Sequence, residues 1–413
     1  MTKHNKILEG KAHITFQIGS LSMKNEPTSN NNNESARTTD LLDQIVLGRR
    51  SFLLGTAAIT AGATLGAWVP NARAAIGGNL EVMAWEGYTL EPETADWRKA
   101  NNVTMRAAIM SNQDDVTAKI VGNNAVRLDL AEYSNGYNAI YDELGVLTEI
   151  DTSKLPNYNK DDIYPPFYEG DMWFWDGKNY AIPWVWGLDT IVVNPELTGF
   201  EVKSYKDLLR PELTGKLAFL DNPLTVWPQI AKVTGYGEKF PNLTKDELKD
   251  CFEKLKPYRD QTKVFASSNG DVISLFASGE IAACFCVWSA VPLETSKQNV
   301  KTVAVYPKEG GAVWADAWFI PKTAVNIDTA TAFINEALDP EIQASVCKTA
   351  VASTVSKKAP ALMDSETKAL FDYEHFDEQF KTLKIYGQPP RTSDEFATYD
   401  DWLQVWADFR AGF

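Results

Sequence analysis

Beyond residue 79 the chain alternates between two patterns of apolar and polar positions. Short runs rich in β-branched and aromatic residues, such as 80–85 and 103–109, are typical of strands. Segments such as 114–121 instead place apolar residues at the spacing of one helix face. This alternation of strands and helices predicts an α/β fold with a mostly parallel sheet.

The same rhythm continues through the second half of the chain. Further strands are expected over 128–133, 216–220, 281–288, 302–306 and 312–320, and further helices over 93–100, 137–144, 226–233, 245–255, 329–338, 341–350 and 393–411. Ligands of parallel sheets bind at the carboxyl ends of the strands. The loops after Trp85 and Tyr133 are therefore the first places where we expect a site.

An export signal precedes this region. Arg49 and Arg50 are followed by Phe and Leu, then by a stretch rich in Gly, Ala and Thr that ends in Ala-Arg-Ala at Ala74. The stretch is short and interrupted for a membrane span of about 20 apolar residues, and its pattern resembles a twin-arginine signal. We expect residues 1–74 to be a leader and signal peptide cleaved near Ala74, which predicts a periplasmic protein.

Charge and composition exclude several functions. The net charge of −15 becomes −18 without residues 1–74, which carry eight basic and five acidic side chains. That acidity argues against nucleic acid and is permissive for a cationic ligand. His375 is the one histidine after residue 74, and no nucleotide-binding or nucleophile motif is present. We expect no enzyme, cofactor or metal site.

Tryptophans beside acidic residues suggest a site for an organic ammonium ion. Trp85 precedes Glu86 at the end of an expected strand, and Trp314 lies two residues before Asp316 within another. An aromatic face attracts a cation by about 0.5–2 kcal/mol, and a carboxylate adds a charge-assisted hydrogen bond. A single tryptophan is more often a core residue than a binding residue, but the set beside acids favours a binding site.

Several segments resemble the periplasmic spermidine- and putrescine-binding proteins, and the similarity extends over nearly the whole chain after the signal. The segments are 84–88 (Ala-Trp-Glu-Gly-Tyr), 180–187 (Tyr-Ala-Ile-Pro-Trp-Val-Trp-Gly), 306–311 (Tyr-Pro-Lys-Glu-Gly-Gly) and 313–321 (Val-Trp-Ala-Asp-Ala-Trp-Phe-Ile-Pro). The resemblance implies the solute-binding component of an ABC importer, which captures a polyamine-like cation, hands it to a permease in the inner membrane and performs no catalysis. We expect a monomer.

The resemblance also implies a two-lobed type II periplasmic binding fold, with a mainly parallel sheet in each lobe and the ligand cleft between them. Residues 79–186 and 315–360 would form lobe 1, and 187–314 and 361–413 would form lobe 2. The ligand-binding residues that it implies are Trp85, Glu86, Ser134, Tyr137, Asn222, Thr225, Trp288, Trp314, Asp316 and Thr392.

The chain departs from that family pattern at one end of the expected cleft. Asn222 and Thr225 stand where spermidine binders carry acids, and Thr392 stands where they carry Gln, with Arg391 beside it. A shorter diamine or a zwitterion such as a betaine or an amino-acid derivative therefore stays open as the ligand. A ferric-ion carrier on the same fold and an exported enzyme on a similar two-lobed fold also stay open as functions.

Overall fold

The computed structural model describes residues 76–110, 113–122 and 125–412. The predicted signal peptide and its cleavage site lie outside these ranges. Within them, no helix combines the length and apolar character that a membrane crossing requires.

The described chain is a mixed α/β structure whose strands follow the order β2-β1-β3-β12-β7-β10-β8-β9 in one sheet path. The strands are β1 (Gly78–Ala84), β2 (Val103–Ile109), β3 (Leu130–Ser134), β4 (Leu147–Thr148), β5 (Phe174–Trp175), β6 (Lys178–Asn179), β7 (Ala181–Val193), β8 (Leu217–Leu220), β9 (Thr262–Ala266), β10 (Ala283–Trp288), β11 (Val303–Val305), β12 (Ala312–Pro321), β13 (Ser353–Thr354) and β14 (Lys384–Ile385). The α-helices are α2 (Ala95–Ala100), α3 (Gln113–Ile120), α4 (Asn138–Glu143), α5 (Pro195–Thr198), α6 (Pro223–Val233), α7 (Lys245–Gln261), α8 (Asn269–Ala277), α9 (Val291–Ser296), α10 (Ile327–Ala337), α11 (Pro340–Ala350), α12 (Ser365–Lys368), α13 (Phe376–Gln379) and α14 (Tyr399–Ala411).

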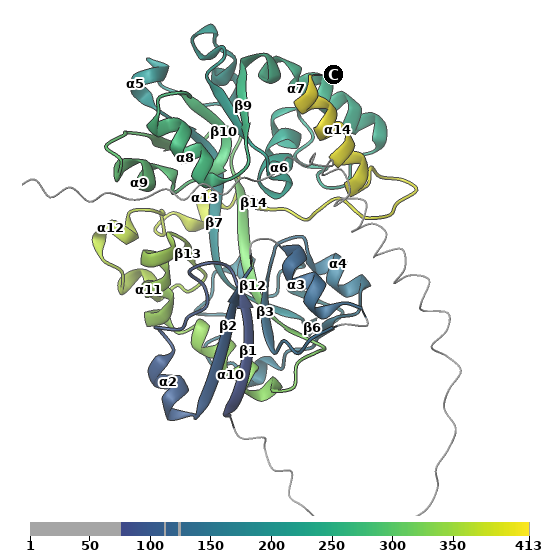
Figure 1. Cartoon of the computed structure of the whole chain (residues 1–413), viewed down its shortest axis with the longest axis vertical. Coiled ribbons are helices and arrows are strands. Elements are labelled where there is room, and N and C mark those ends of the chain that lie inside the picture. Colours follow the sequence, from purple (N-terminus) through teal and green to yellow (C-terminus); the bar gives the residue numbers. More distant parts are fainter. Residues whose placement is uncertain (1–75, 111–112, 123–124, 413) are drawn as a thin grey trace, which may run out of the picture. The chain divides into compact units, whose positions relative to one another are not determined.

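Two long strands link the two halves of this sheet. β1 runs parallel to β2 and β3, and β8 runs parallel to β9 and β10, as the α/β pattern predicts. β7 and β12 are antiparallel to each other, and they pair with β10 and β3 respectively. Figure 1 shows β7 and β12 passing side by side from the lower group of elements to the upper group.

Each half has its own hydrophobic core. The first core gathers buried side chains from β1, β3, α10 and one end of both long strands. The second gathers them from β8, β10, α7 and α14, around buried tryptophans such as Trp402. Phe371, Phe376 and Leu383 pack into the first core, so the segment 361–413, which we assign to lobe 2 from the sequence, contributes to both. The exact lobe boundaries stay a prediction.

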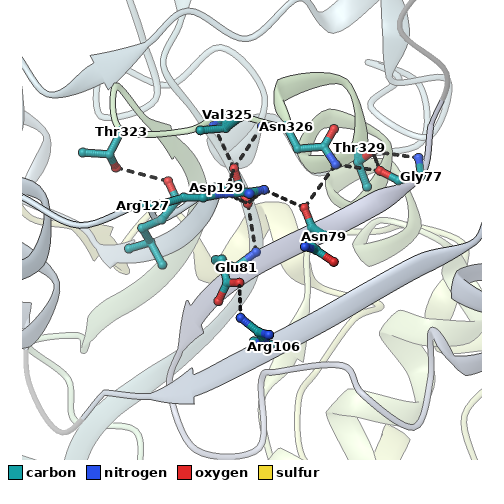
Figure 2. A network of polar contacts seen from close by, with 11 residues as sticks. Gly77, Asn79, Glu81, Arg106, Arg127, Asp129, Thr323, Val325, Asn326 and Thr329 are labelled. Carbon is teal, nitrogen blue, oxygen red and sulfur yellow. Dashed lines mark hydrogen bonds and ion pairs between the residues drawn. The ribbon is translucent and has the colours of Figure 1, made fainter.

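A buried carboxylate, Asp129, holds several segments together at the end of the first lobe that is farther from the second lobe. The Asp129 side chain accepts hydrogen bonds from Arg127 and from the backbone N–H groups of Glu81, Val325 and Asn326 at 2.7–3.0 Å. Figure 2 shows Asp129 at the centre of these contacts. The Arg127 hydrogen bond and the backbone donors outweigh burial and lower the pKa of Asp129. The carboxylate thereby joins β1, β3 and the turn before α10 in one network.

Candidate functional site

A cavity of about 770 Å³ lies where strand ends and loops of the two lobes meet. It is lined by Trp85, Glu86, Gly87, Tyr88, Ser134, Asn135, Asp189, Asn222, Thr225, Pro228, Asn269, Trp288, Glu294, Ala312, Val313, Trp314, Asp316, Thr349, Ala350, Val351 and Tyr386. The loops after β1 and β3, which the sequence singles out, both contribute. The volume suits a small organic ligand.

Most of the predicted site residues come together here. Eight of the ten line the cavity: Trp85, Glu86, Ser134, Asn222, Thr225, Trp288, Trp314 and Asp316. Tyr137 and Thr392 lie outside its described lining. Tyr137 directly precedes α4, and its ring centroid is 6.0 Å from that of Tyr141. Thr392 is exposed, and the neighbouring Arg391 guanidinium lies 4.0 Å from the Tyr399 ring.

Asp316 is a buried carboxylate on the long strand β12. It is 5 % exposed, and its Oδ1 accepts a hydrogen bond from the Ser134 hydroxyl at 2.5 Å. Burial raises the pKa of Asp316 to about 6, against the opposing effect of Ser134 and Trp85. The buried N–H group of the Trp85 indole lies near the Asp316 carboxylate and favours its ionised form. This N–H has no hydrogen-bond partner of normal geometry among the described residues. A cation in the cavity would stabilise the ionised form further.

Asp189, on β7, is a second buried carboxylate in the lining, and it is 7 % exposed. Burial raises the pKa of Asp189 to about 7, a hydrogen bond with the Thr225 side chain lowers it, and the charge of Asp316 raises it further. Neither carboxylate has an ion pair with a basic side chain in the described part of the chain. Both therefore retain charge that a cationic ligand could neutralise.

A glycine lets an aromatic ring approach the strand backbone closely between these two acids. Gly187 on β7 is the register partner of Trp314 on β12. A Cβ at Gly187 would lie 2.2 Å from the Trp314 ring, so the ring occupies the space that any other side chain would need. The Trp314 indole therefore covers the strand backbone at this point of the cavity.

Glu132 lies behind the cavity wall and positions Trp85. It is fully buried on β3, and it accepts the backbone N–H of Trp85 at 3.0 Å and the indole N–H of Trp184 at 2.6 Å. Burial, together with the charge of Asp316, raises the pKa of Glu132 well above its ordinary value. Its hydrogen bonds fix the start of the loop that carries Trp85 and Glu86.

The second lobe supplies the opposite wall. Asn222 and Thr225 lie at the start of α6, directly after β8, and Trp288 ends β10. Glu294 comes from the short helix α9. The wall therefore combines an aromatic ring, two neutral polar groups and one acid, Glu294, whose carboxylate is paired with Lys297 at 2.7 Å.

The charged side chains in the described lining of the cavity are all acidic. Its described residues include four carboxylates, on Glu86, Asp189, Glu294 and Asp316, and no Lys, Arg or His. They also include three tryptophans and two tyrosines. Carboxylates with aromatic faces are the groups that hold alkylammonium ions, by charge-assisted hydrogen bonds and cation–π contacts.

Sequence reasoning does not identify several of the lining residues. Asp189 follows Trp184 and Trp186 on a largely apolar strand, so the pattern of tryptophans beside acids includes it, but it is not among the predicted site residues. Asn135 is visible only through its contacts: its side chain accepts the Ala315 N–H and donates to the Tyr386 carbonyl. Tyr386 replaces the predicted Thr392 as the contribution of the C-terminal segment to the cavity.

The one histidine after residue 74 lies away from this cavity. His375 is exposed and contacts Asp372, away from the described lining. Across the described ranges, no cluster of three or more His, Cys, Asp or Glu side chains is placed to hold a metal ion. The four cysteines are buried and free.

Two α/β lobes that share two long strands around an acidic, aromatic cavity define the class of two-lobed solute-binding proteins. The chain belongs to the bacterial extracellular solute-binding protein family, whose model matches residues 94–374. This is a family of solute-binding proteins and not of enzymes.

Similar proteins come from several bacteria. The spermidine/putrescine-binding periplasmic protein of Escherichia coli is 25 % identical over 287 residues, which cover 68 % of this chain and 79 % of that protein. The putrescine-binding periplasmic protein of Pseudomonas aeruginosa is 28 % identical over 290 residues, covering 65 % and 75 %. A spermidine/putrescine ABC transporter substrate-binding protein from Streptococcus pneumoniae shares the fold, with a TM-score of 0.70, 20 % identity and coverage of 81 % and 99 %.

Proposed function

We propose that the protein captures a small organic cation of the polyamine type, such as putrescine or spermidine, for an ABC importer. The observation that carries this proposal is the lining of the cavity, which presents four carboxylates and no basic side chain among its described residues. The names of the similar proteins from E. coli and P. aeruginosa support the same ligand class.

Each side chain has a role in this proposal. Asp316 accepts hydrogen bonds from an ammonium group while Ser134 holds the carboxylate in place. Trp85, Trp288 and Trp314 cover the alkyl chain and attract the positive charge. Glu86 adds negative charge at the rim, and Asn222 and Thr225 supply orienting hydrogen bonds from the second lobe.

The proposal extends to location and partners. Export through the twin-arginine signal and cleavage near Ala74 would release a monomeric carrier into the periplasm, the location that the names of the similar proteins give. The loaded carrier would deliver its ligand to a permease in the inner membrane. Two-lobed periplasmic binding proteins generally close their lobes around the ligand by a hinge motion.

A zwitterion, a ferric ion and an enzyme substrate fit the cavity less well. A zwitterion needs a cationic partner for its carboxylate, and Arg391 lies outside the described lining. A ferric-ion carrier needs clustered ligands, and the described ranges hold no cluster of three or more His, Cys, Asp or Glu side chains placed for a metal ion. An enzyme that used His375 would need that residue at the site, and His375 is not part of the described lining.

The direct test is a thermal-shift and calorimetric panel of putrescine, spermidine, cadaverine, a betaine and several amino acids. We expect the amines with two or more positive charges to raise the melting temperature and the others to do so less. If neutral or anionic solutes stabilise the protein and no amine does, the proposed function is wrong.

Two matched variants then locate the site. Asp316→Asn removes one negative charge inside the cavity, and Asp161→Asn removes one from an exposed loop. Loss of a buried charge pair costs about 2–4 kcal/mol, which is roughly 30- to 1000-fold in Kd. We expect this increase in Kd for Asp316→Asn. For Asp161→Asn we expect a change in Kd below about twofold, since dissolved salt screens the interaction between an exposed charge and a distant ligand.

A further inference from the structure

The register of the two long strands places Asp189 and Asp316 on one face of the sheet. Ala312, Trp314 and Asp316 alternate along β12, and their partners on β7 are Asp189, Gly187 and Val185 respectively. Side chains two and four residues apart share a face, and so do those of directly paired residues. Along the strand direction the two acids are therefore about 13 Å apart at Cα, and both line the cavity.

The Trp314 ring occupies the interval between the two acids. Its register partner is Gly187, at the middle of the interval, and the ring lies against that glycine. The order along this face is thus carboxylate, aromatic ring, carboxylate. An alkyl chain with a positive group at each end is complementary to that order, because the chain can lie on the ring while the two ends reach the acids.

Asp129 shows how this protein stabilises a buried acid that serves structure. Asp129 is also buried, but it is paired with Arg127 and accepts three backbone N–H groups (Figure 2). Among the described residues, the Asp189 carboxylate has only the Thr225 hydroxyl as a hydrogen-bond partner, and its pKa is raised where that of Asp129 is lowered. A structural role does not account for an acid buried with so little compensation.

The groups around Asp189 do not neutralise it. Asp316 faces it from β12, and the thiols of Cys284 and Cys286 on β10 and the Tyr205 hydroxyl are near enough to interact with its charge. From α6, Gln229 donates to the backbone carbonyl of Asp189 at 3.4 Å. Lys232 of the same helix donates instead to the carbonyls of Gly311 and Thr382.

We propose that Asp189 forms a second ammonium subsite at the far end of the Trp314 ring from Asp316, so that the cavity selects ligands with a positive charge at both ends. This proposal rests on the proposed function, since it assigns the second end of the same ligand. It also supplies an anionic group where Asn222 and Thr225 leave the predicted cleft without acids.

Three ligands of the same length separate the two ends. Putrescine carries two ammonium groups, 4-amino-1-butanol has a hydroxyl in place of one of them, and 4-aminobutyrate has a carboxylate in place of one terminal aminomethyl group. For the wild-type protein at pH 8 we expect affinity to fall in that order. The step from diamine to amino alcohol should be about 10- to 100-fold, the usual effect of one charged hydrogen bond.

Asp189→Asn preserves the shape of the side chain but removes its charge, so it should reduce the difference in affinity between putrescine and the amino alcohol. We expect Kd for putrescine to rise about 10- to 100-fold and Kd for the amino alcohol to change less than about threefold. Asp316→Asn should weaken both ligands. Asp189→Glu keeps the charge and should retain a clear preference for the diamine, and circular dichroism checks that each variant is folded.

The outcomes separate the two proposals. If Asp189→Asn weakens putrescine and the amino alcohol equally, or weakens neither, the second subsite is refuted and the proposed function is unaffected. If the wild-type protein prefers 4-aminobutyrate, the second subsite is also refuted, because a carboxylate would then lie beside Asp189. If the wild-type protein binds no amine of any length, it is the proposed function that fails.

Discussion

Affinity for a diamine should depend strongly on pH, because both buried acids of the cavity must be ionised to bind it. Burial raises the pKa of Asp316 to about 6 and that of Asp189 to about 7 in the empty protein. The amine itself stays protonated across this range, since alkylammonium groups titrate near pH 10. Protonation of either acid therefore competes directly with the ligand.

The magnitude follows from the ionised fractions. At pH 5 an acid with a pKa of 6 is about one-tenth ionised and one with a pKa of 7 about one-hundredth, whereas both are mostly ionised at pH 8. Kd should thus rise about 10-fold between pH 8 and pH 5 if Asp316 alone contacts the ligand. If Asp189 contacts it as well, the rise should approach 10³-fold.

Isothermal titration calorimetry with putrescine at several pH values between 5 and 8 measures this dependence. Repeating the titration at pH 7 in buffers of different ionisation enthalpy counts the protons released, which should be greater than zero. A Kd that stays constant within about twofold from pH 5 to pH 8 would show that the two acids have ordinary pKa values near 4, because such acids stay ionised throughout.

Three further predictions concern packing and stability. Gly187→Ala should weaken amine binding at least 10-fold by displacing the Trp314 ring, and adding Trp314→Ala should cause little further loss; additive effects in this double-mutant cycle would contradict the contact. Asp129→Ala should cost about 3–5 kcal/mol in urea unfolding, because it strands Arg127 and three backbone donors; a cost below about 1 kcal/mol would show that the network is dispensable. Asp189→Asn should stabilise the empty protein at pH 8 by up to about 4 kcal/mol and hardly at all at pH 4. Because burial raises the pKa of Asp189, the wild-type protein loses stability as the pH rises from about 4 through 7 and this carboxyl ionises. Equal melting temperatures of variant and wild type at both pH values would show that burying the charge of Asp189 costs little.

Much of the fold could be predicted from periodicity. The expected strand over 103–109 is β2 in full, and the expected helix over 341–350 differs from α11 by one residue. Periodicity misses the segment that forms β9 and α8, because the Asn269-Gly270 start of α8 is typical of a turn and its cap comes from Ser268. The expected helix over 393–411 begins only at Tyr399, where the Thr398 side chain caps it.

The site is predictable where chemistry lies at strand ends and not where it depends on pairing. Trp85, Trp314 and Asp316 stand out because tryptophans lie within two residues of acids in or directly beside predicted strands. Asp189 lies inside a 13-residue buried strand, and only the register between β7 and β12 reveals that it shares a face with Asp316. Thr392 is inferred from family spacing, and the chain reaches the cavity at Tyr386 instead.

A crystal structure of the protein with putrescine would show whether Asp316 binds an ammonium group in this cavity. We expect the diamine in the cavity between the lobes, with one ammonium within hydrogen-bond distance of Asp316 and the alkyl chain on the Trp314 ring. A diamine bound elsewhere, or bound in this cavity without contact to the Asp316 carboxylate, would contradict the account.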